Sequence, residues 1–352
     1  MRVALVHDDL VQWGGAERVL EGLTEIFPNA PIYTSVFNRE NNELNKRFGK
    51  REIFTSFLQK IPGWRCLYKA MLPLYPIAFE QFDFTNFDLV ISQTTRFAKS
   101  IITKPKTKHI CLCHTPPRFL WHFSGENSFG LLEVLMSKLR IYDQISARRV
   151  DLFIAGSENA KKRIKSIYKQ ESKVVYPFID VERFEGVTSF DGGYFLVISR
   201  LNYYKRIDIA IKACLKLGLS LKVIGSGPEE DRLKQLGGNI DFLNNLDDET
   251  VVQVLAGCKA LIVPGIEDFG LTPLEAQALG KPVIAFKGGG VLETVIDGKT
   301  GILFGEQSTT GLINALKIFS KSRFNQLDIK KNAERFSKEK FIKDFKQIVA
   351  FV

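Results

Sequence analysis

Short apolar segments recur through the second half of the chain, each followed by a polar loop and a helix-like stretch. These mainly apolar segments stand at 195–198, 221–224, 240–243, 261–263 and 282–286. Strands that are apolar on both faces belong in a sheet covered on both sides, and strands that alternate with helices pair in parallel. The second half is therefore predicted to be an α/β domain, with helices at 207–217 and 248–255 among those that cover its sheet.

The first half shows the same organisation less regularly. Strands are predicted at 2–6, 89–91, 109–112, 152–154 and 174–176, and an amphipathic helix at 16–26. Residues 40–85 are aromatic and basic, and they are predicted to be irregular in structure. The segment from Pro177 to Gly193 is the predicted linker. Two α/β domains with a cleft between them follow, and such clefts bind ligands at the carboxyl ends of the strands.

Positive charge is concentrated in the first half of the chain. Residues 1–176 contain 26 Lys and Arg against 17 Asp and Glu, which is +9 of the net charge of +10. Nucleic acid, an anionic membrane surface and a phosphorylated substrate are all partners of this sign. No helix-turn-helix, zinc finger or ribonucleoprotein motif is present, which disfavours nucleic acid.

Targeting and cysteine patterns favour a cytoplasmic protein. Charge follows the first apolar residues too soon for a signal peptide, and no run of about 18 apolar residues predicts a membrane span. The five cysteines include no Cys-x-x-Cys pair, so we expect them to be reduced and to form no zinc site. A buried strand explains Cys111 and Cys113 better than a metal does.

Several loops contain residues suited to an anionic ligand. Gly14 and Gly15 stand where a strand turns into a helix, although a plain turn explains them equally well. Arg200 and Lys205 follow a strand and suit a diphosphate, with a solvated basic loop as the alternative. Gly225 begins a further glycine-containing loop of the same kind.

The segment from Glu267 to Glu275 is the most informative. Thr272 is a predicted helix N-cap, Pro273 suits the first helical position, and Glu275 would complete a capping box. That structural role does not extend to Glu267, which lies in the loop with Gly270 and could hold sugar or ribose hydroxyls. In the first half, His114 ends a strand and is predicted to point at the same cleft.

A set of motifs in a fixed order carries a resemblance to a known family. The motifs are Gly14-Gly-Ala-Glu17, His114-Thr-Pro-Pro117, Ser199-Arg-Leu201, Tyr204-Lys-Arg-x-Asp208, Gly225-x-Gly-Pro228, Glu267 and Glu275 with seven residues between them, and Gly288-Gly-Gly-x-x-Glu293. Together they resemble the retaining GT-B glycosyltransferases of family 4 over residues 1 to about 305. The His-Thr-Pro-Pro and Tyr-Lys-Arg-x-Asp versions are most similar to mannosyltransferases of surface-polysaccharide assembly.

The resemblance implies a GT-B fold, in which two Rossmann-like domains with parallel sheets face each other across a cleft. Residues 1–178 would form the acceptor-side domain and residues 179–333 the domain that binds the nucleotide-sugar donor. Residues 334–352 would form a helix that packs back on the first domain. The implied activity is metal-independent hexosyl transfer with retained anomeric configuration. It would use no cofactor and would favour GDP-mannose as donor.

The resemblance also implies roles for individual residues. Arg200 and Lys205 would hold the donor diphosphate, Glu275 would bond the nucleotide ribose, and His114 would contact the donor sugar near the reacting carbon. The other donor-binding residues would be Gly14, Gly15, Gly225, Asp247, Glu267, Phe269, Gly270, Leu271 and Thr272. Of these, Glu267 would act with His114, Arg200 and Lys205 in catalysis.

The acceptor is expected to be a glycan hydroxyl, on a lipid-linked saccharide at a membrane surface. The basic first half and four residues of interfacial type motivate this expectation: Trp64, Arg65, Tyr68 and Lys69. A folded subdomain with a solvated basic face is the alternative. The enzyme would then work in the cytoplasm, peripherally on the inner face of the membrane.

Competing functions remain open on the same fold. They are a UDP-sugar-dependent transferase, a sugar-nucleotide epimerase or hydrolase, and a non-catalytic subunit that binds nucleotide sugars. A dehydrogenase is disfavoured because neither half has the dinucleotide glycine pattern with its ribose-binding acid.

Overall fold

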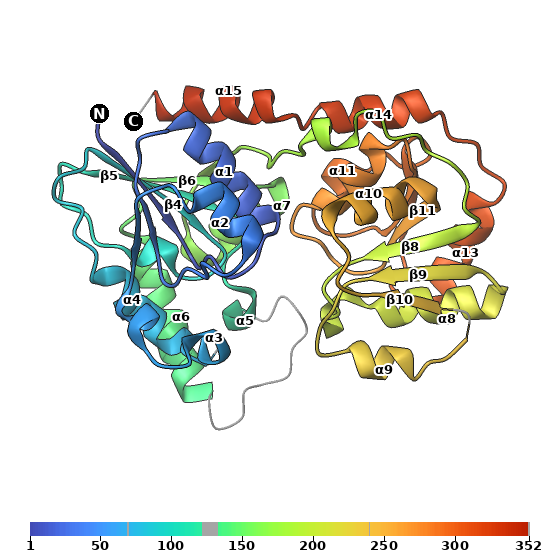
Figure 1. Cartoon of the computed structure of the whole chain (residues 1–352), viewed down its shortest axis with the longest axis horizontal. Helices are drawn as coiled ribbons and strands as arrows, with labels where there is room; N and C mark the ends of the chain where they lie inside the picture. The colour runs from blue at the N-terminus through green and yellow to red at the C-terminus, as the bar shows by residue number, and fades with distance from the viewer. Residues whose placement is uncertain (69, 122–132, 239, 351–352) are drawn as a thin grey trace. The chain divides into compact units, whose positions relative to one another are not determined.

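The computed structural model describes residues 1–68, 70–121, 133–238 and 240–350. They form two compact units. The first unit runs from Met1 to Tyr176 and includes the stretch that begins at Phe341, and the second runs from Pro177 to Lys340. Each unit contains one parallel β-sheet (Figure 1).

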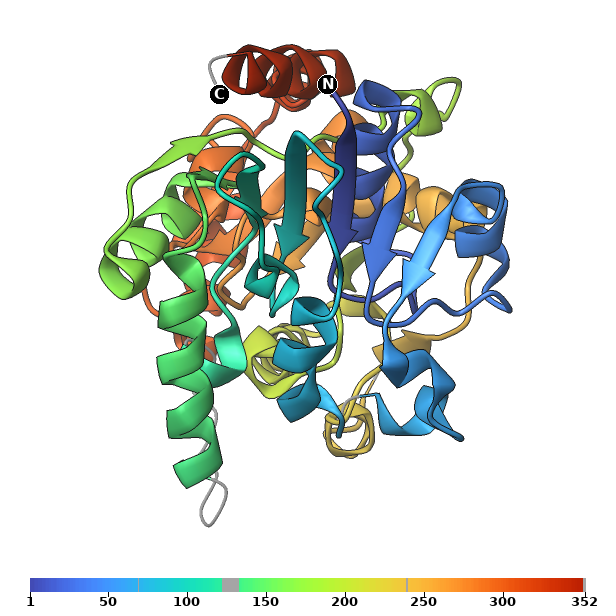
Figure 2. The same ribbon diagram turned by 90° about the vertical axis from the view of Figure 1, so that its left-hand side faces the viewer.

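The first unit is built on a seven-stranded sheet in the order β3-β2-β1-β4-β5-β6-β7 (Figure 2). The strands are β1 (Val3–His7), β2 (Ile32–Thr34), β3 (Ile53–Thr55), β4 (Leu89–Thr94), β5 (Lys108–Cys113), β6 (Leu152–Ala155) and β7 (Ser172–Val174). All neighbours pair in parallel. Every residue of β1 and β4 is buried, as expected for strands covered on both faces.

The second unit is built on a six-stranded parallel sheet in the order β10-β9-β8-β11-β12-β13. Its strands are β8 (Tyr194–Ile198), β9 (Ser220–Ile224), β10 (Ile240–Leu243), β11 (Cys258–Val263), β12 (Val283–Phe286) and β13 (Gly301–Phe304). The alternation of strands and helices predicted for this half is confirmed, and β13 is an additional strand.

Helices connect the strands in both units. Those of the first unit are α1 (Gly15–Ile26), α2 (Asn42–Phe48), α3 (Trp64–Leu67), α4 (Tyr75–Glu80), α5 (Arg118–Trp121), α6 (Glu133–Ala147) and α7 (Glu158–Tyr168). Those of the second are α8 (Ile207–Leu217), α9 (Glu230–Lys234), α10 (Asp248–Gly257), α11 (Leu271–Ala278), α12 (Val291–Thr294), α13 (Thr309–Phe319) and α14 (Gln326–Glu334). The last helix is α15 (Lys338–Val349). Among the described residues, no helix combines the length and the apolar character needed to cross a membrane.

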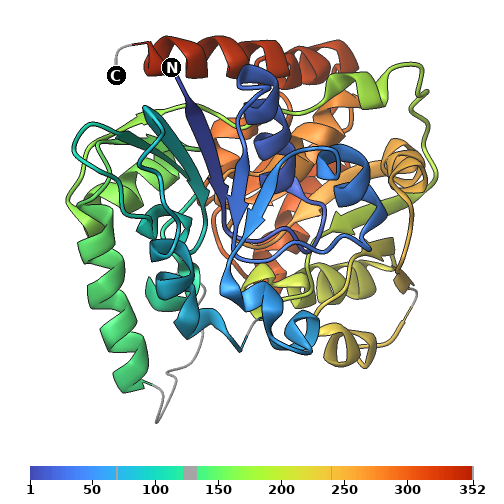
Figure 3. The ribbon, with the colours of Figure 1, turned by 60° about the vertical axis from the view of Figure 1, so that its left-hand side comes forward.

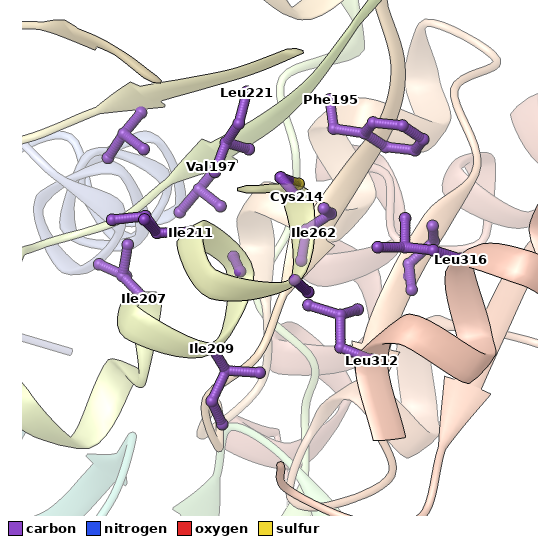
Figure 4. Close-up of a cluster of buried hydrophobic side chains, with 14 of the residues drawn as sticks. Phe195, Val197, Ile207, Ile209, Ile211, Cys214, Leu221, Ile262, Leu312 and Leu316 are labelled. Carbon is purple, nitrogen blue, oxygen red and sulfur yellow. The ribbon is translucent and has the colours of Figure 1, made fainter. Parts of the chain in front are cut away.

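The strand β8 shows how both faces of the second sheet are covered. Phe195 and Val197 enter a core with residues of α8 and α13 (Figure 4). Tyr194 and Leu196, which point to the other face, enter a core with residues of α10 and α11. Because successive side chains of a strand point to opposite faces, one apolar run supplies both cores.

Three predicted segments differ from the structure. The predicted linker is packed rather than open, since Val181–Phe184 forms the 3₁₀ turn η5 and Phe184 is buried with residues of α10 and α11. The stretch 40–85 contains helices and a strand of three to seven residues, too short to leave a periodic pattern. The predicted terminal helix at 334–352 is shorter in the structure, where α15 begins at Lys338 and ends at Val349.

Candidate functional site

Loops at the carboxyl ends of the second sheet contain most of the predicted site residues. Arg200 follows β8, Gly225 follows β9, Asp247 lies between β10 and α10, and Glu267 follows β11. These four strands are neighbours in one parallel sheet, so their carboxyl ends share one edge. This is the edge at which open α/β sheets bind ligands.

A cation and an anion from two of these loops are in direct contact. Lys205 ends the 3₁₀ turn η6 (Tyr203–Lys205), and its Nζ lies 2.6 Å from Oε1 of Glu267. Their side chains are 11% and 23% exposed. The loops also meet through their backbones, because a Cβ on Gly265 would lie 2.7 Å from the Lys205 Cα. An anionic ligand at this edge would compete with Glu267 for the Lys205 ammonium.

Arg200 is exposed, and within the described part of the chain its side chain forms no ion pair. The two predicted cations therefore differ in their surroundings in the ligand-free chain. Lys205 is held by a carboxylate, whereas the guanidinium of Arg200 extends toward solvent.

Gly225 is required by the packing of two loops. Its φ is +135°, and a Cβ there would lie 1.9 Å from the backbone oxygen of Ser199. The same loops are joined by a hydrogen bond from Leu201 N to Ser226 O at 2.8 Å. The β8 and β9 loops thus support each other, and this close approach explains the glycine without a ligand.

The backbone of the Glu267 loop packs closely against the glycines that follow β12. Gly290 N donates to the Glu267 carbonyl oxygen at 2.8 Å, and a Cβ on Gly289 would lie 2.3 Å from that oxygen. Phe269, from the same loop, is buried with its ring 5.5 Å from that of Phe336. The loop therefore has a fixed course, which suits a site that must hold a ligand.

The predicted capping box at α11 is wrong. The helix begins at Leu271, and its N-cap is Gly270, with φ +103° and no side-chain cap. Because glycine reaches this conformation without strain, the chain enters the helix before Thr272. Pro273 still lies in the first turn, where its missing N–H costs nothing. The carboxylate of Glu275 instead accepts a hydrogen bond from Arg183.

Arg183, which the sequence did not single out, joins two helices at this site. Its Nη1 lies 3.1 Å from Oε1 of Glu275 and its Nη2 lies 2.5 Å from Oδ1 of Asp248. Asp247, the neighbour of Asp248, caps α10 by accepting from Thr250 N at 2.8 Å. Hydrogen bonds from Thr250 lower the pKa of Asp247 below its ordinary value. No sequence signal links Arg183 to a helix 92 residues later.

In the first unit, His114 follows β5 and contacts Gln93 of β4. The Gln93 Nε2 donates to Ala16 O at 2.6 Å and lies 2.7 Å from Nε2 of His114. Because the Ala16 carbonyl can only accept, Gln93 must present its NH₂ group here, and His114 Nε2 is the acceptor. This arrangement holds a neutral imidazole with its proton on Nδ1, beside the start of α1.

The start of α1 is held by a buried pair. Gly14 is the N-cap of α1 and Gly15 its first residue, and a Cβ on Gly14 would lie 3.2 Å from a carboxylate oxygen of Glu17. The other oxygen of Glu17 lies 3.5 Å from His7 Nε2. Burial opposes protonation of His7, but the hydrogen bond and charge of Glu17 outweigh it and raise its pKa.

The residues predicted to contact a membrane are only partly on the surface. Trp64 is buried in the core of the first unit, Tyr68 is half-buried, and Arg65 is paired with Glu40 at 2.5 Å. Lys69 lies outside the described residues. Trp64 packs in this core, where an aromatic ring buries a large apolar area.

Other apolar side chains are exposed nearby in the chain and on α6. Leu67 at the end of α3, Leu74 just before α4 and Ile77 within α4 are exposed, and Ile77 is 59% exposed. On α6, which Figure 3 shows in green, the exposed apolar residues are Val134, Leu135, Ile141 and Ile145. Tyr142 of α6 donates to Glu80 of α4 at 2.7 Å, so the two helices are neighbours.

Neither the cysteines nor the acidic residues of the described part form a metal cluster. No group of three or more His, Cys, Asp or Glu that could hold a metal ion occurs there. Cys111 and Cys113 are buried in an apolar core, as predicted. Burial raises the pKa of Cys111 to about 12, so this thiol stays protonated at neutral pH.

Comparison with known proteins covers nearly all of the chain. Residues 13–183 match the family described as Glycosyltransferase Family 4, and residues 178–336 match Glycosyl transferases group 1. An alpha-1,3/1,6-mannosyltransferase, ALG2 of Dictyostelium discoideum, is 26% identical over 376 residues, covering 86% of each chain. The human ALG2 is also 26% identical, over 86% of this chain and 83% of its own.

Solved structures show the same fold at lower identity. The apo form of the lipopolysaccharide outer core galactosyltransferase WaaB superposes with a TM-score of 0.69 at 17% identity, over 100% of both chains. Anabaena HepE in complex with UDP-glucose superposes with a TM-score of 0.72 at 18% identity, again over 100% of both. Two α/β units with parallel sheets of seven and six strands accord with these neighbours.

Proposed function

Because the chain belongs to glycosyltransferase family 4 and has the GT-B fold, we propose that it transfers mannose from GDP-mannose to a hydroxyl of a lipid-linked glycan. The transfer retains the anomeric configuration and uses no metal or cofactor. The products belong to surface polysaccharide or glycolipid synthesis. The observation that best supports the donor site is the contact of Lys205 with Glu267, at the sheet edge where the exposed Arg200 follows β8.

The donor diphosphate binds Arg200 and Lys205 in this proposal. Negative charge grows on the leaving phosphate as the glycosidic bond breaks, and the two cations stabilise it. The acceptor hydroxyl gives its proton to that phosphate and forms the new glycosidic bond on the same face. Glu267, released from Lys205 as the phosphate takes its place, holds sugar hydroxyls.

The remaining donor contacts are proposed from the family resemblance. Phe269 to Thr272 hold the sugar and the distal phosphate, and Glu275 bonds the ribose. Asp247 lies near the base, and Gly225 forms part of the loop beside the diphosphate. In the first unit, Gly14 and Gly15 let backbone N–H groups face the phosphate, and His114 contacts the donor sugar through its neutral imidazole.

The choice of mannose rests on relatives. The ALG2 proteins, which are 26% identical to this chain over most of their length, are named as mannosyltransferases. A UDP-sugar donor is the second candidate, supported by the fold shared with HepE, whose structure contains UDP-glucose. A subunit that binds nucleotide sugars without transfer is the third.

A membrane surface is the proposed place of the acceptor, on the cytoplasmic side. Supporting it are the basic residues of the first half and the exposed apolar side chains of α6 and of residues 67–77. Flotation with vesicles that contain or lack anionic lipid tests this part. Binding to anionic vesicles alone supports it, and binding to neither contradicts it.

The experiment that tests the donor site is nucleotide-dependent stabilisation followed by transfer assays. GDP, UDP, ADP and dTDP are compared at concentrations up to millimolar, where a ligand at 100 times its Kd adds about 2.7 kcal/mol of stability. Stabilisation by GDP alone supports mannose, and stabilisation by UDP changes the donor.

Transfer from GDP-mannose is then compared for Arg200→Ala, Lys205→Ala and Arg232→Ala. We expect losses of about 10²-fold for the first two, as for removal of a transition-state charge donor. Arg232, on α9, pairs only with the nearby Glu229 in the described structure and serves as a control. Near-normal turnover in both site variants would contradict the assignment.

A further inference from the structure

Arg183 occupies a position that no predicted role explains. It lies in η5, ahead of the first strand of the second unit, yet its side chain reaches Glu275 on α11 and Asp248 on α10. The Arg183 side chain is only 17% exposed, and that of Glu275 is 18% exposed. Asp248 is 58% exposed, so the guanidinium joins a partly buried carboxylate to an exposed one, and its bond to Glu275 is held more firmly than an exposed surface pair.

The backbone of Arg183 is anchored beside both of its partners. The next residue, Phe184, is buried in a core that includes Leu255 of α10 and Ala276 of α11. The aromatic ring thus fixes η5 against the same two helices that the guanidinium joins. The guanidinium carbon also lies 5.3 Å from the centre of the Phe184 ring, which limits its movement.

The geometry of the contacts separates the two nitrogens of the guanidinium. Nη1 donates to Glu275 and Nη2 to Asp248, so the planar group spans both carboxylates. Lysine has a single ammonium and would not reproduce this span. A carboxylate has about four lone-pair positions, so Glu275 can accept ligand hydroxyls while bound to Arg183.

We propose that Arg183 is a positioning residue that aims the Glu275 carboxylate at the nucleotide ribose, with Asp248 holding the other end of the guanidinium. This inference rests on the proposed role of Glu275. Arg183 touches neither nucleotide nor sugar in this proposal. It fixes the direction of the Glu275 carboxylate relative to the first turn of α10, where Asp248 lies, and therefore determines how strongly the enzyme distinguishes ribose from deoxyribose.

The test is ribose discrimination measured by titration calorimetry. The Kd of the nucleoside diphosphate, GDP or UDP, that binds the wild type more tightly is compared with that of its 2′,3′-dideoxy form. We expect the wild type to prefer the ribonucleotide by about tenfold or more, as for loss of hydrogen bonds to a charged group. Glu275→Gln and Arg183→Gln should each reduce this preference to about twofold, and the double variant should reduce it no further.

Three further variants separate positioning from folding. Arg183→Lys should restore only part of the preference, and Asp248→Asn, which leaves Arg183 on Glu275, should give an intermediate value. Arg232→Ala should leave it unchanged. Far-UV circular dichroism and melting temperature show whether each variant is folded, and the ratio of the two Kd values does not move with stability alone.

Each outcome bears on a distinct statement. A folded Arg183→Gln protein that keeps the wild-type preference overturns the inference about Arg183. A wild-type preference that survives Glu275→Gln overturns the ribose role of Glu275 and the inference with it, while the donor site at Lys205 stands. A wild type that binds neither GDP nor UDP overturns the proposed function itself.

Discussion

The contact of Lys205 with Glu267 allows a quantitative prediction for the proposed donor site without ligand. The atoms are 2.6 Å apart, and the side chains are 11% and 23% exposed. Exposed pairs contribute about 0–1 kcal/mol, whereas breaking a buried pair costs about 3–5 kcal/mol. This pair lies between these limits, so we expect a coupling free energy of about 1.5–2 kcal/mol from the cycle of Lys205→Ala, Glu267→Gln and the double variant.

Urea unfolding of the four proteins measures this coupling. The three tryptophans stand at 13, 64 and 121, all in the first unit. Fluorescence therefore follows the first unit, while far-UV circular dichroism follows both and supplies the coupling. The i,i+3 pair of Arg232 with Glu229, whose side chains are 47% and 20% exposed, is the control, with an expected coupling of about 0.3–0.5 kcal/mol.

A saturating nucleoside diphosphate should reduce the coupling, because the diphosphate takes the Lys205 ammonium from Glu267. A coupling below about 0.5 kcal/mol without ligand would show that the pair does not form in solution. A coupling that nucleotide leaves unchanged would show that Lys205 is not where the diphosphate binds.

Three other predictions concern stability. Gly225→Ala should lower the free energy of unfolding by at least about 2 kcal/mol, because the new Cβ would lie 1.9 Å from a backbone oxygen. Gly298→Ala, where φ is +73° but the surroundings are open, should lower it by only about 1 kcal/mol. Equal losses in urea unfolding would contradict the packing argument. Burial lowers the pKa of His109 from 6.5 to about 4. The neutral imidazole therefore contributes about 3 kcal/mol of stability, which is full above pH 6.5 and is lost as the pH falls toward 4. The stability of His109→Asn, measured by unfolding between pH 4 and 7, should lack this dependence. Asp143→Ala leaves Lys99 buried without its carboxylate and should cost about 3–5 kcal/mol in the tryptophan-detected transition, and a loss under 1 kcal/mol would refute this.

The fold was predictable where an apolar run is long enough to be identified as a strand buried on both faces. The segment 195–198 supplies both faces of the second sheet, so its continuity predicted a covered strand correctly. The strands β2 and β3 contain three residues each, and no periodicity can be read from so few. They pair with longer neighbours, and that tertiary setting decides their structure.

The site was predictable in part, for the same kind of reason. Loop residues at the ends of parallel strands, such as Arg200 and Glu267, can be placed at one edge from strand order alone. The start of α11 could not, because the backbone conformation of Gly270 determines it rather than the capping preference of Thr272. Arg183 was missed since its partners lie on distant helices, and Trp64 was misplaced since residue type does not show which way a short helix faces.

The division of the chain between the two units has a consequence for biosynthesis. Phe341 and Phe345 of α15 are fully buried, and the stretch that begins at Phe341 belongs to the first unit. The ribosome therefore releases the last part of the first unit only after it has made the whole of the second. A nascent chain stopped near residue 340 would hold a complete second unit and an unfinished first one. Removal of residues 341–352 should accordingly make the first unit, residues 1–176, more sensitive to proteolysis than the second unit, residues 177–340.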